Sequence, residues 1–395
     1  MSAQHADRSR AHWGLRHLLR ANAGVAPRPE RMVFLGLRTY GGVGGIQAFN
    51  QRVIRTLVAR AETRAGAPPL IVLRDDVQGD MPEGLNARFR PCGRSRARAA
   101  FEAMKAMRGA DLILLGHINL LPFAAVARWW APRAALVLFA HGVEVWGVPR
   151  YRRPKWYDGT LLRRLDKVVS VSAFTARRAE AAFRLWPDLF SVFANAVDAV
   201  DVAREGNAPS QEFLSVARLT DAEQGKNIDK VLRAVARIAP QYPGLRYTVI
   251  GEGALRTSLM ALANELGITD RVHFAGRVDQ AGLNAAYARA CAFVLPSEKE
   301  GFGIVFLEAW QRRLPVICGN RDAACEIVSD NEDGFVVDPA DIAALADRMA
   351  WLIDHPAASR AMGDAGHTKV QERYLMANFA QRLDGILDLV LRGRG

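Results

Sequence analysis

Cysteine is scarce in this sequence, with four cysteines in 395 residues. Cys92, Cys291, Cys318 and Cys325 form no CxxC pair and stand at no metal-ligand spacing from a histidine. Disulfide scaffolds need many closely placed cysteines, and zinc modules need paired ligands. The sequence therefore excludes both classes and predicts reduced thiols in a cytoplasmic protein.

Long apolar runs are also missing. The most apolar stretch, residues 112–126, is interrupted by His117, Asn119 and Pro122. Crossing a bilayer takes about 20 apolar residues, and the charged N-terminus is not followed by the apolar segment of a signal peptide. We expect no membrane-spanning helix, while peripheral contact with a membrane stays open.

Positive charge is concentrated in the first half of the chain. Residues 1–200 contain 31 Lys and Arg against 15 Asp and Glu, whereas the remaining residues contain 22 against 26. A basic half joined to a faintly acidic half predicts an anionic partner for the first, such as nucleic acid, phospholipid or a phosphorylated substrate.

The length of the chain suits two domains, and short apolar runs alternate with helix-like stretches in both halves. This alternation predicts an α/β protein with two doubly wound parallel sheets, Rossmann-like, that face a cleft at the carboxyl ends of their strands. The strands are expected at 32–37, 70–73, 112–115, 135–140 and 168–171, then at 213–216, 247–250, 272–275, 292–295 and 316–318. The expected parts are a basic extension at 1–30, a first domain at 31–202, a linker at 203–212, a second domain at 213–375 and a helix at 376–395 that crosses back to the first domain.

Two glutamates flank a glycine-rich turn after one of the second-domain strands. Glu300 precedes Gly301, Phe302 and Gly303, and Glu308 lies in the helix that begins at about Gly303. Backbone N–H groups at a helix start carry partial positive charge and suit phosphate or sugar oxygens. Two carboxylates around such a turn favour a ligand site over a solvated surface.

In the first domain, glycines and histidines follow the expected strands. The run 41–45, which includes Gly44 and Gly45, lets the backbone approach a ligand closely, although it is not the GxGxxG pattern of dinucleotide sites. His141 follows the strand at 135–140, and His117, a weaker candidate, follows the strand at 112–115.

The segment from Pro296 to Val316, PSEKEGFGIVFLEAWQRRLPV, resembles the E-x7-E signature of the retaining glycosyltransferases of family 4, which have the GT-B fold. The likeness is densest over residues 213–340. It implies that Glu300 contacts the donor sugar and that Glu308 binds the ribose hydroxyls of the nucleotide. The family usually has a small residue and a glycine where this sequence has Gln311 and Arg313.

Arg218 and Lys226 match the basic pair of that family. Cleavage of a sugar–phosphate bond releases a diphosphate with added charge, and two permanent cations can neutralise it without a metal. Gly251 looks like the family's strand-end turn, and Arg277 and Val278 match the segment whose backbone meets the nucleotide base.

The resemblance also gives roles to the first domain. It places His141 beside the transferred sugar and the loop with Gly44 and Gly45 near the donor phosphates and the acceptor. Metal-dependent transferases of another fold present Asp-x-Asp to a divalent cation, and this sequence has no strict Asp-x-Asp. We therefore expect a retaining hexosyltransferase that uses UDP- or GDP-hexose and needs neither metal nor cofactor.

Two basic segments of the first domain indicate the acceptor. Residues 94–108 and 150–155 are rich in Arg and Lys, and the second lies beside Trp146 and Trp156. Anionic lipids attract Lys and Arg, and Trp favours the membrane interface. We expect a peripheral enzyme on the inner face of the plasma membrane that extends a polyprenyl-diphosphate-linked saccharide for an exopolysaccharide or another cell-surface glycan.

Two alternatives belong to other classes. A UDP-sugar 2-epimerase of the same architecture would turn over its substrate without an acceptor, but the E-x7-E context weighs against it. A nucleic-acid-binding protein is suggested only by the positive charge. Because no RNA-binding motif or aromatic stacking platform is recognisable, we expect no nucleic-acid partner.

Overall fold

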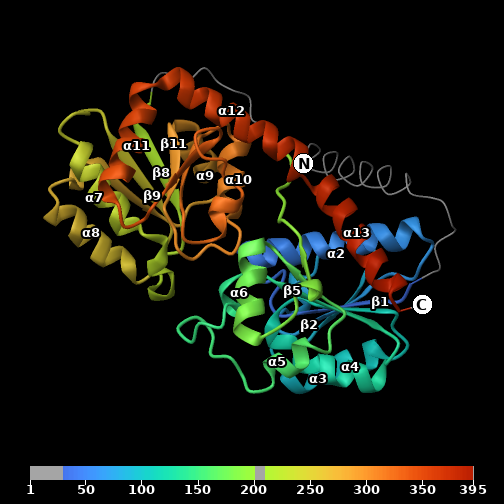
Figure 1. The fold of residues 1–395 in the computed structure, drawn as a ribbon. Coiled ribbons are helices and arrows are strands. Elements are labelled where there is room, and N and C mark those ends of the chain that lie inside the picture. Colours follow the sequence, from blue (N-terminus) through green and yellow to red (C-terminus); the bar gives the residue numbers. More distant parts are fainter. Residues whose placement is uncertain (1–29, 201–209, 395) are drawn as a thin grey trace. The chain divides into compact units, whose positions relative to one another are not determined.

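The computed structural model describes residues 30–200 and 210–394, and the chain divides into two compact units (Figure 1). Unit 1 runs to Ala196 and takes in the chain again from Met376, and unit 2 is Val197–Leu375. The expected extension at 1–30 and most of the expected linker at 203–212 lie outside the described residues. The division between units falls before that linker, and Glu212 already belongs to a strand.

Unit 1 contains a sheet of seven parallel strands in the order β3-β2-β1-β4-β5-β6-β7. The strands are β1 (Met32–Gly36), β2 (Leu70–Leu73), β3 (Arg88–Pro91), β4 (Leu112–Leu115), β5 (Ala135–Ala140), β6 (Lys167–Ser170) and β7 (Phe190–Val192). The α-helices are α2 (Gly45–Thr63), α3 (Arg96–Met107), α4 (Pro122–Trp130), α5 (Asp158–Leu162), α6 (Ala173–Phe183) and α13 (Met376–Arg392). Short 3-10 helices are η2 (Gln78–Asp80), η3 (Ile118–Leu120), η4 (Val143–Val145) and η5 (Pro187–Leu189).

Helices cover both faces of this sheet, which explains why its central strands are apolar throughout. All residues of β1, β4 and β5 are buried, as expected for parallel strands that are covered on two sides. Side chains of α3, α4, α5 and α6 share one core with Val33, Leu115 and Leu138 of these strands. Phe49 of α2 packs instead against Phe139 and, on α13, Phe379, with ring centroids 5.3 and 5.5 Å away.

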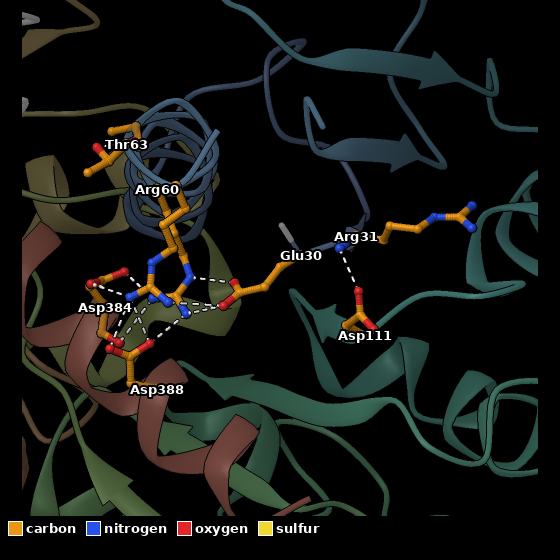
Figure 2. Close-up of polar contacts among 9 residues, drawn as sticks. Glu30, Arg31, Arg60, Thr63, Asp111, Asp384 and Asp388 are labelled. Carbon is orange, nitrogen blue, oxygen red and sulfur yellow. Dashed lines mark hydrogen bonds and ion pairs between the residues drawn. The ribbon is translucent and has the colours of Figure 1, made fainter. Parts of the chain in front are cut away.

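A buried group of charges joins α13 to α2, the two helices that lie side by side in Figure 1. The side chain of Arg60 has no exposed surface and forms ion pairs with Glu30, Asp384 and Asp388 (Figure 2). Arg64 pairs with the same three carboxylates. Burial lowers the pKa of Arg60, but the three carboxylates raise it by a larger amount, so the pKa lies above its ordinary value. The last helix is thereby tied to unit 1.

Unit 2 contains six parallel strands in the order β10-β9-β8-β11-β12-β13. They are β8 (Glu212–Val216), β9 (Arg246–Ile250), β10 (Val272–Gly276), β11 (Ala292–Leu295), β12 (Val316–Gly319) and β13 (Gly334–Val337). The α-helices are α7 (Ile228–Ile238), α8 (Leu255–Glu265), α9 (Gln280–Arg289), α10 (Ile304–Gln311), α11 (Ile342–Asp354) and α12 (Pro356–Arg373), with η6 (Asp221–Lys226), η7 (Thr269–Arg271) and η8 (Ala323–Glu326) between them.

The sheets confirm the two doubly wound parallel sheets expected from the sequence, and they add three strands that the apolar runs did not indicate. These are β3, β7 and β13, and each lies at an edge of its sheet. Among the described residues, no helix has the length and apolar character needed to cross a bilayer.

Candidate functional site

In each sheet the order of the strands reverses beside the first strand of the unit. β8 lies between β9 and β11 in unit 2, and β1 lies between β2 and β4 in unit 1. Because the strands are parallel, their carboxyl ends share one edge, and ligands of open α/β sheets bind at that edge where the order reverses. The sequence places Arg218 after β8, Glu300 after β11 and Gly44 after β1.

Lys226 and Glu300 meet at the reversal point of unit 2. The Nζ atom of Lys226, at the end of η6, forms an ion pair with Oε1 of Glu300, and the two side chains are only 15% and 14% exposed. Burial lowers the pKa of Lys226, but Glu300, Glu223 and Asp322 raise it by more. Lys226 is therefore a permanent cation beside the glycine-rich turn, held by the first glutamate of the E-x7-E pair.

Asp322 fixes the backbone of Glu300, a role that the sequence pattern did not indicate. Its carboxylate has no exposed surface and accepts the N–H of Glu300 at 2.7 Å and the N–H of Ala324 at 2.9 Å. The N–H of Ala323 in turn donates to the carbonyl of Glu300 at 3.1 Å. Burial, followed by the charge of Glu300, raises the pKa of Asp322 to about 7. The feature of the sequence that could have indicated this role is the position of Asp322 shortly after the apolar run of β12.

Arg218 is the exposed cation of the site. Its side chain is 76% exposed and pairs with Glu223 at 2.8 Å, and Glu223 also contacts Lys299 at 3.4 Å. Burial lowers the pKa of Lys299, and the charges of Lys226 and Arg218 lower it further against the opposing pull of Glu223. Arg218 and Lys299 thus share one carboxylate at this edge, and the sequence pattern did not indicate Lys299.

Two glycines shape the backbone here. Gly303 precedes α10 with φ +95°, and a Cβ atom there would lie 2.6 Å from the ring of Phe306. At Gly251, a Cβ atom would lie 1.8 Å from the carbonyl oxygen of Ala217, so the turn after β9 presses against the residue before Arg218. Both positions require glycine.

The residues around Gly303 contribute mainly through their backbone. Phe302 is only 6% exposed, and its ring packs edge-on against Tyr374 with centroids 6.0 Å apart. Gly301 is half-buried. The helix α10 starts at Ile304, as expected, so its first N–H groups follow directly on the glutamate turn.

Glu308 lies in α10 on the side of α9. The hydroxyl of Tyr287 donates to its Oε2 atom at 3.4 Å, and the guanidinium of Arg312 lies 4.5 Å from the centre of the Tyr287 ring. Burial and then Glu308 raise the pKa of Tyr287 far above its ordinary value. Tyr287 therefore stays protonated as a donor to the second glutamate of the pair.

The other predicted donor-side residues lie after the edge strand β10. Arg277 is exposed and Val278 is half-buried. The carbonyl of Gly276 accepts the N–H of Gly251 at 2.9 Å, so the turns after β9 and β10 are joined. The turn with Gly251 is thus joined to the turn with Arg277 and Val278. Their strands, β9 and β10, lie two and three positions from β11, which precedes Glu300.

The two departures from the family pattern have visible consequences. Gln311 is 3% exposed, and its Nε2 atom donates to the carbonyl of Asp198 at 2.6 Å. Arg313 adopts a left-handed φ of +56°, a conformation that favours glycine. Its guanidinium forms an ion pair with Asp364 at 2.9 Å.

In unit 1, a buried carboxylate organises the glycine-rich loop after β1. Asp76, with no exposed surface, accepts the N–H groups of Thr39, Tyr40 and Gly41 at 2.8, 2.6 and 2.7 Å. The loop then leads through Gly44 into Gly45, the first residue of α2. Asp76 escaped the sequence analysis, although it also follows an apolar run.

His141 is a neutral donor inside unit 1. Its Nε2 atom donates to the carbonyl of Gly116 at 2.9 Å, which leaves Nδ1 as an acceptor. Burial lowers the pKa of His141. Burial likewise lowers the pKa of His117 to about 4, and the two rings are stacked with centroids 6.5 Å apart. Both imidazoles are therefore uncharged at neutral pH.

The described residues contain no group of three or more His, Cys, Asp or Glu side chains that could hold a metal ion.

Both halves of the chain match glycosyltransferase families. Residues 43–200 match the model described as Glycosyltransferase Family 4, and residues 203–369 match Glycosyl transferases group 1. A GDP-mannose-dependent alpha-(1-6)-phosphatidylinositol monomannoside mannosyltransferase of Mycobacterium tuberculosis is 31% identical over 65% of this chain and 72% of that protein. The lipopolysaccharide core biosynthesis mannosyltransferase LpcC of Rhizobium leguminosarum is 25% identical over 77% of this chain and 81% of that protein.

Solved structures share the architecture. The crystal structure of Anabaena Alr3699/HepE in complex with UDP and glucose matches with a TM-score of 0.71 at 20% identity, covering 91% of this chain and all of that one. A sucrose-phosphate synthase from Thermosynechococcus elongatus matches with a TM-score of 0.70 at 19% identity, covering 92% of this chain and all of that one. The two parallel sheets and these neighbours show the GT-B fold. The chain belongs to glycosyltransferase family 4, as the E-x7-E segment implied.

Proposed function

We propose that this glycosyltransferase moves a hexosyl group from a UDP- or GDP-sugar to a saccharide acceptor, with retention at the anomeric carbon and without a metal or cofactor. The observation that carries the proposal is the ion pair of Lys226 with Glu300 at the reversal point of the unit 2 sheet. The GDP-mannose-dependent relative supports a nucleotide sugar as donor and makes GDP-mannose the first to test.

The chemistry needs charge neutralisation where the leaving diphosphate gains negative charge. Arg218, Lys226 and the first N–H groups of α10 supply it. Glu300 balances the charge of Lys226, and an arriving diphosphate would compete for that cation. As the sugar–phosphate bond breaks, a diphosphate oxygen takes the proton of the acceptor hydroxyl, and the new glycosidic bond forms on the same face of the sugar.

The remaining predicted residues position the donor. Glu300 contacts the sugar, Glu308 binds the ribose hydroxyls, and the backbone at Arg277 and Val278 meets the base. Tyr287 supports Glu308 by its hydrogen bond. In unit 1, the neutral His141 offers its Nδ1 atom to a sugar hydroxyl, and the glycine-rich loop lies near the phosphates.

For the acceptor we propose a polyprenyl-diphosphate-linked saccharide, extended at the inner face of the plasma membrane during synthesis of an exopolysaccharide or cell-surface glycan. The excess of Lys and Arg in residues 1–200 supports an anionic membrane surface as partner. The relatives from Mycobacterium tuberculosis and Rhizobium leguminosarum are named for transfer to a phosphatidylinositol mannoside and to lipopolysaccharide core, which also supports a glycolipid acceptor.

The test is a panel of UDP- and GDP-sugars, with and without membrane lipid extract and EDTA, followed by nucleotide release and by the anomeric configuration of the product. We expect one donor to be used only when acceptor is present, with an unchanged rate in EDTA and a retained anomer. Glu300→Gln should lower the rate by about 10²–10³, whereas Glu265→Gln, on the exposed end of α8, should not change it. Isomerisation of a UDP-sugar without nucleotide release would overturn the proposal in favour of the epimerase.

A further inference from the structure

The segment between η4 and α5 of unit 1, residues 147–157 (the 147–157 loop), carries charge of one sign. Its sequence is GVPRYRRPKWY, with four cations and no carboxylate. It follows β5 and His141 in the chain, so it leaves the sheet at the edge where the strands end. In Figure 1 it runs outside the helical layer before entering α5.

The base of the loop is fixed by buried contacts. Arg152 pairs with Asp158 at 2.7 Å, and the side chain of Asp158 is fully buried. The N–H of Lys155 donates to the same carboxylate at 2.7 Å, and Nε of Arg152 donates to Asn119 at 3.1 Å. Trp146, expected from the sequence to lie beside a lipid-facing segment, is only 5% exposed. Trp146 and Arg152 therefore face inward and hold the loop.

The tip of the loop faces solvent. Trp156 is 94% exposed, the highest value among the large apolar side chains that the structure describes. Arg150, Arg153 and Lys155 are exposed around it, and Nζ of Lys155 lies 5.5 Å from the centre of the Tyr157 ring. A loop that is held at its base thus exposes one large aromatic side chain and three cations within seven residues.

We propose that the 147–157 loop docks the enzyme on anionic lipid, with Trp156 in the interfacial layer and Arg150, Arg153 and Lys155 on the headgroups. This assignment rests on the proposed function at a membrane. A specific protein partner usually needs about 800 Å² of complementary surface on each side, whereas one Trp among cations suits a flat, negatively charged interface. Docking here would bring lipid to the sheet edge from which His141 projects.

Another exposed tryptophan provides a matched control. Trp129, at the end of α4, is 77% exposed. Because α4 leads from the end of β4 back to the start of β5, Trp129 lies toward the opposite edge of the sheet. Arg128 beside it is already paired with Asp166 at 2.8 Å.

The experiment measures co-sedimentation of the full chain with two kinds of vesicle. One is phosphatidylcholine alone, and the other contains 30 mol% phosphatidylglycerol, which is chosen to give a negative surface potential of roughly 30 mV in magnitude. We expect binding to the anionic vesicles. The double variant Arg153→Ser/Lys155→Ser should bind them about 30-fold more weakly, which corresponds to about 1 kcal/mol for each cation removed. Trp156→Ala should weaken binding to both vesicle types, and Trp129→Ala should match the wild type.

A second readout separates this proposal from the proposed function. Nucleotide release with a water-soluble saccharide acceptor should be equal in the wild type and in all three variants, because none of the changed residues is among those proposed to bind the donor. Equal vesicle binding by the double variant and the wild type, or an equal loss in Trp129→Ala and Trp156→Ala, would overturn the loop assignment while leaving the transfer reaction intact. If the wild type released no nucleotide from any of the donors tested, the proposed function would be overturned instead.

Discussion

Replacing Asp322 by asparagine tests whether the site contains a carboxyl group that titrates near neutral pH. Asp322 accepts N–H groups from Glu300 and Ala324 and has no exposed surface. Asparagine has nearly the same shape but carries no charge at any pH. It keeps one oxygen acceptor and loses the other, which costs about 1–3 kcal/mol independently of pH.

The pH-dependent part can be worked from the raised pKa. Burial and Glu300 raise the pKa of Asp322 to about 7, against about 3.9 in an unfolded chain. Between these values the folded protein keeps a proton that the unfolded chain has lost, so its stability falls as the pH rises from about 4 to 7 and stays low above 7. The full shift of about three units corresponds to about 4 kcal/mol, of which about 2–3 kcal/mol is lost between pH 5 and 8.

The assay is urea unfolding of wild type and Asp322→Asn at pH 5, 6, 7 and 8. The free energy of unfolding of the variant, relative to wild type, should rise by about 2–3 kcal/mol from pH 5 to 8, mostly below pH 7. Asp338→Asn is the control, because Ala340 and Arg321 lower the pKa of this exposed carboxylate; it is ionised in the folded and unfolded chain alike from pH 5 to 8, so the difference from wild type should stay constant over this range. Parallel curves for wild type and Asp322→Asn would refute the reasoning.

Three further changes have definite expected outcomes. Lys226→Ala should lower the rate of nucleotide release by about 10²–10³, because it removes the buried cation of the site; a rate within a factor of three of wild type would contradict that role. Arg313→Gly should raise the free energy of unfolding by up to about 1 kcal/mol, since relief of the left-handed strain exceeds the loss of a partly exposed ion pair; a destabilised variant in urea unfolding would contradict it. Arg60→Met should lower the free energy of unfolding by about 3–5 kcal/mol, because it removes the buried cation and leaves three carboxylates with Arg64 as their remaining partner; thermal unfolding close to that of wild type would show that the charge cluster contributes little.

The central strands could be predicted because burial on both faces leaves a continuous apolar run in the sequence. β4 (LILL) and β5 (ALVLFA) are clear examples. Two of the strands missed by this criterion, β3 and β7, lie at sheet edges where burial is incomplete. In β3 (RFRP) both arginines are exposed, and β7 is three residues long with none of them buried. Their pairing comes from neighbouring strands rather than from their own composition.

The position of the site followed from the rule that loops at the ends of parallel strands meet. That rule placed Arg218 and Glu300 at one edge of unit 2 from the sequence alone. It could not show which charges pair, because Lys226 and Glu300 are 74 residues apart and their contact depends on how η6 and the turn after β11 fold. The role of Asp322 depends on two backbone N–H bonds, which leave no distinctive pattern in the side-chain sequence.

A count of Lys and Arg in residues 1–200 does not show which of these cations are paired with carboxylates. Many of its cations are neutralised by carboxylates distant in the sequence, since Arg60 and Arg64 face Asp384 and Asp388 of α13. Arg128 and Arg152 likewise have carboxylate partners within unit 1. The electrostatic attraction of unit 1 for an anionic surface therefore depends on where cations stay exposed together, not on their number. In the 147–157 loop Arg150, Arg153 and Lys155 are exposed near Trp156 in the sequence, and the buried carboxylate of Asp158 is already paired with the fourth cation, Arg152. That combination, rather than the overall excess of arginine, makes the loop the place to test for lipid.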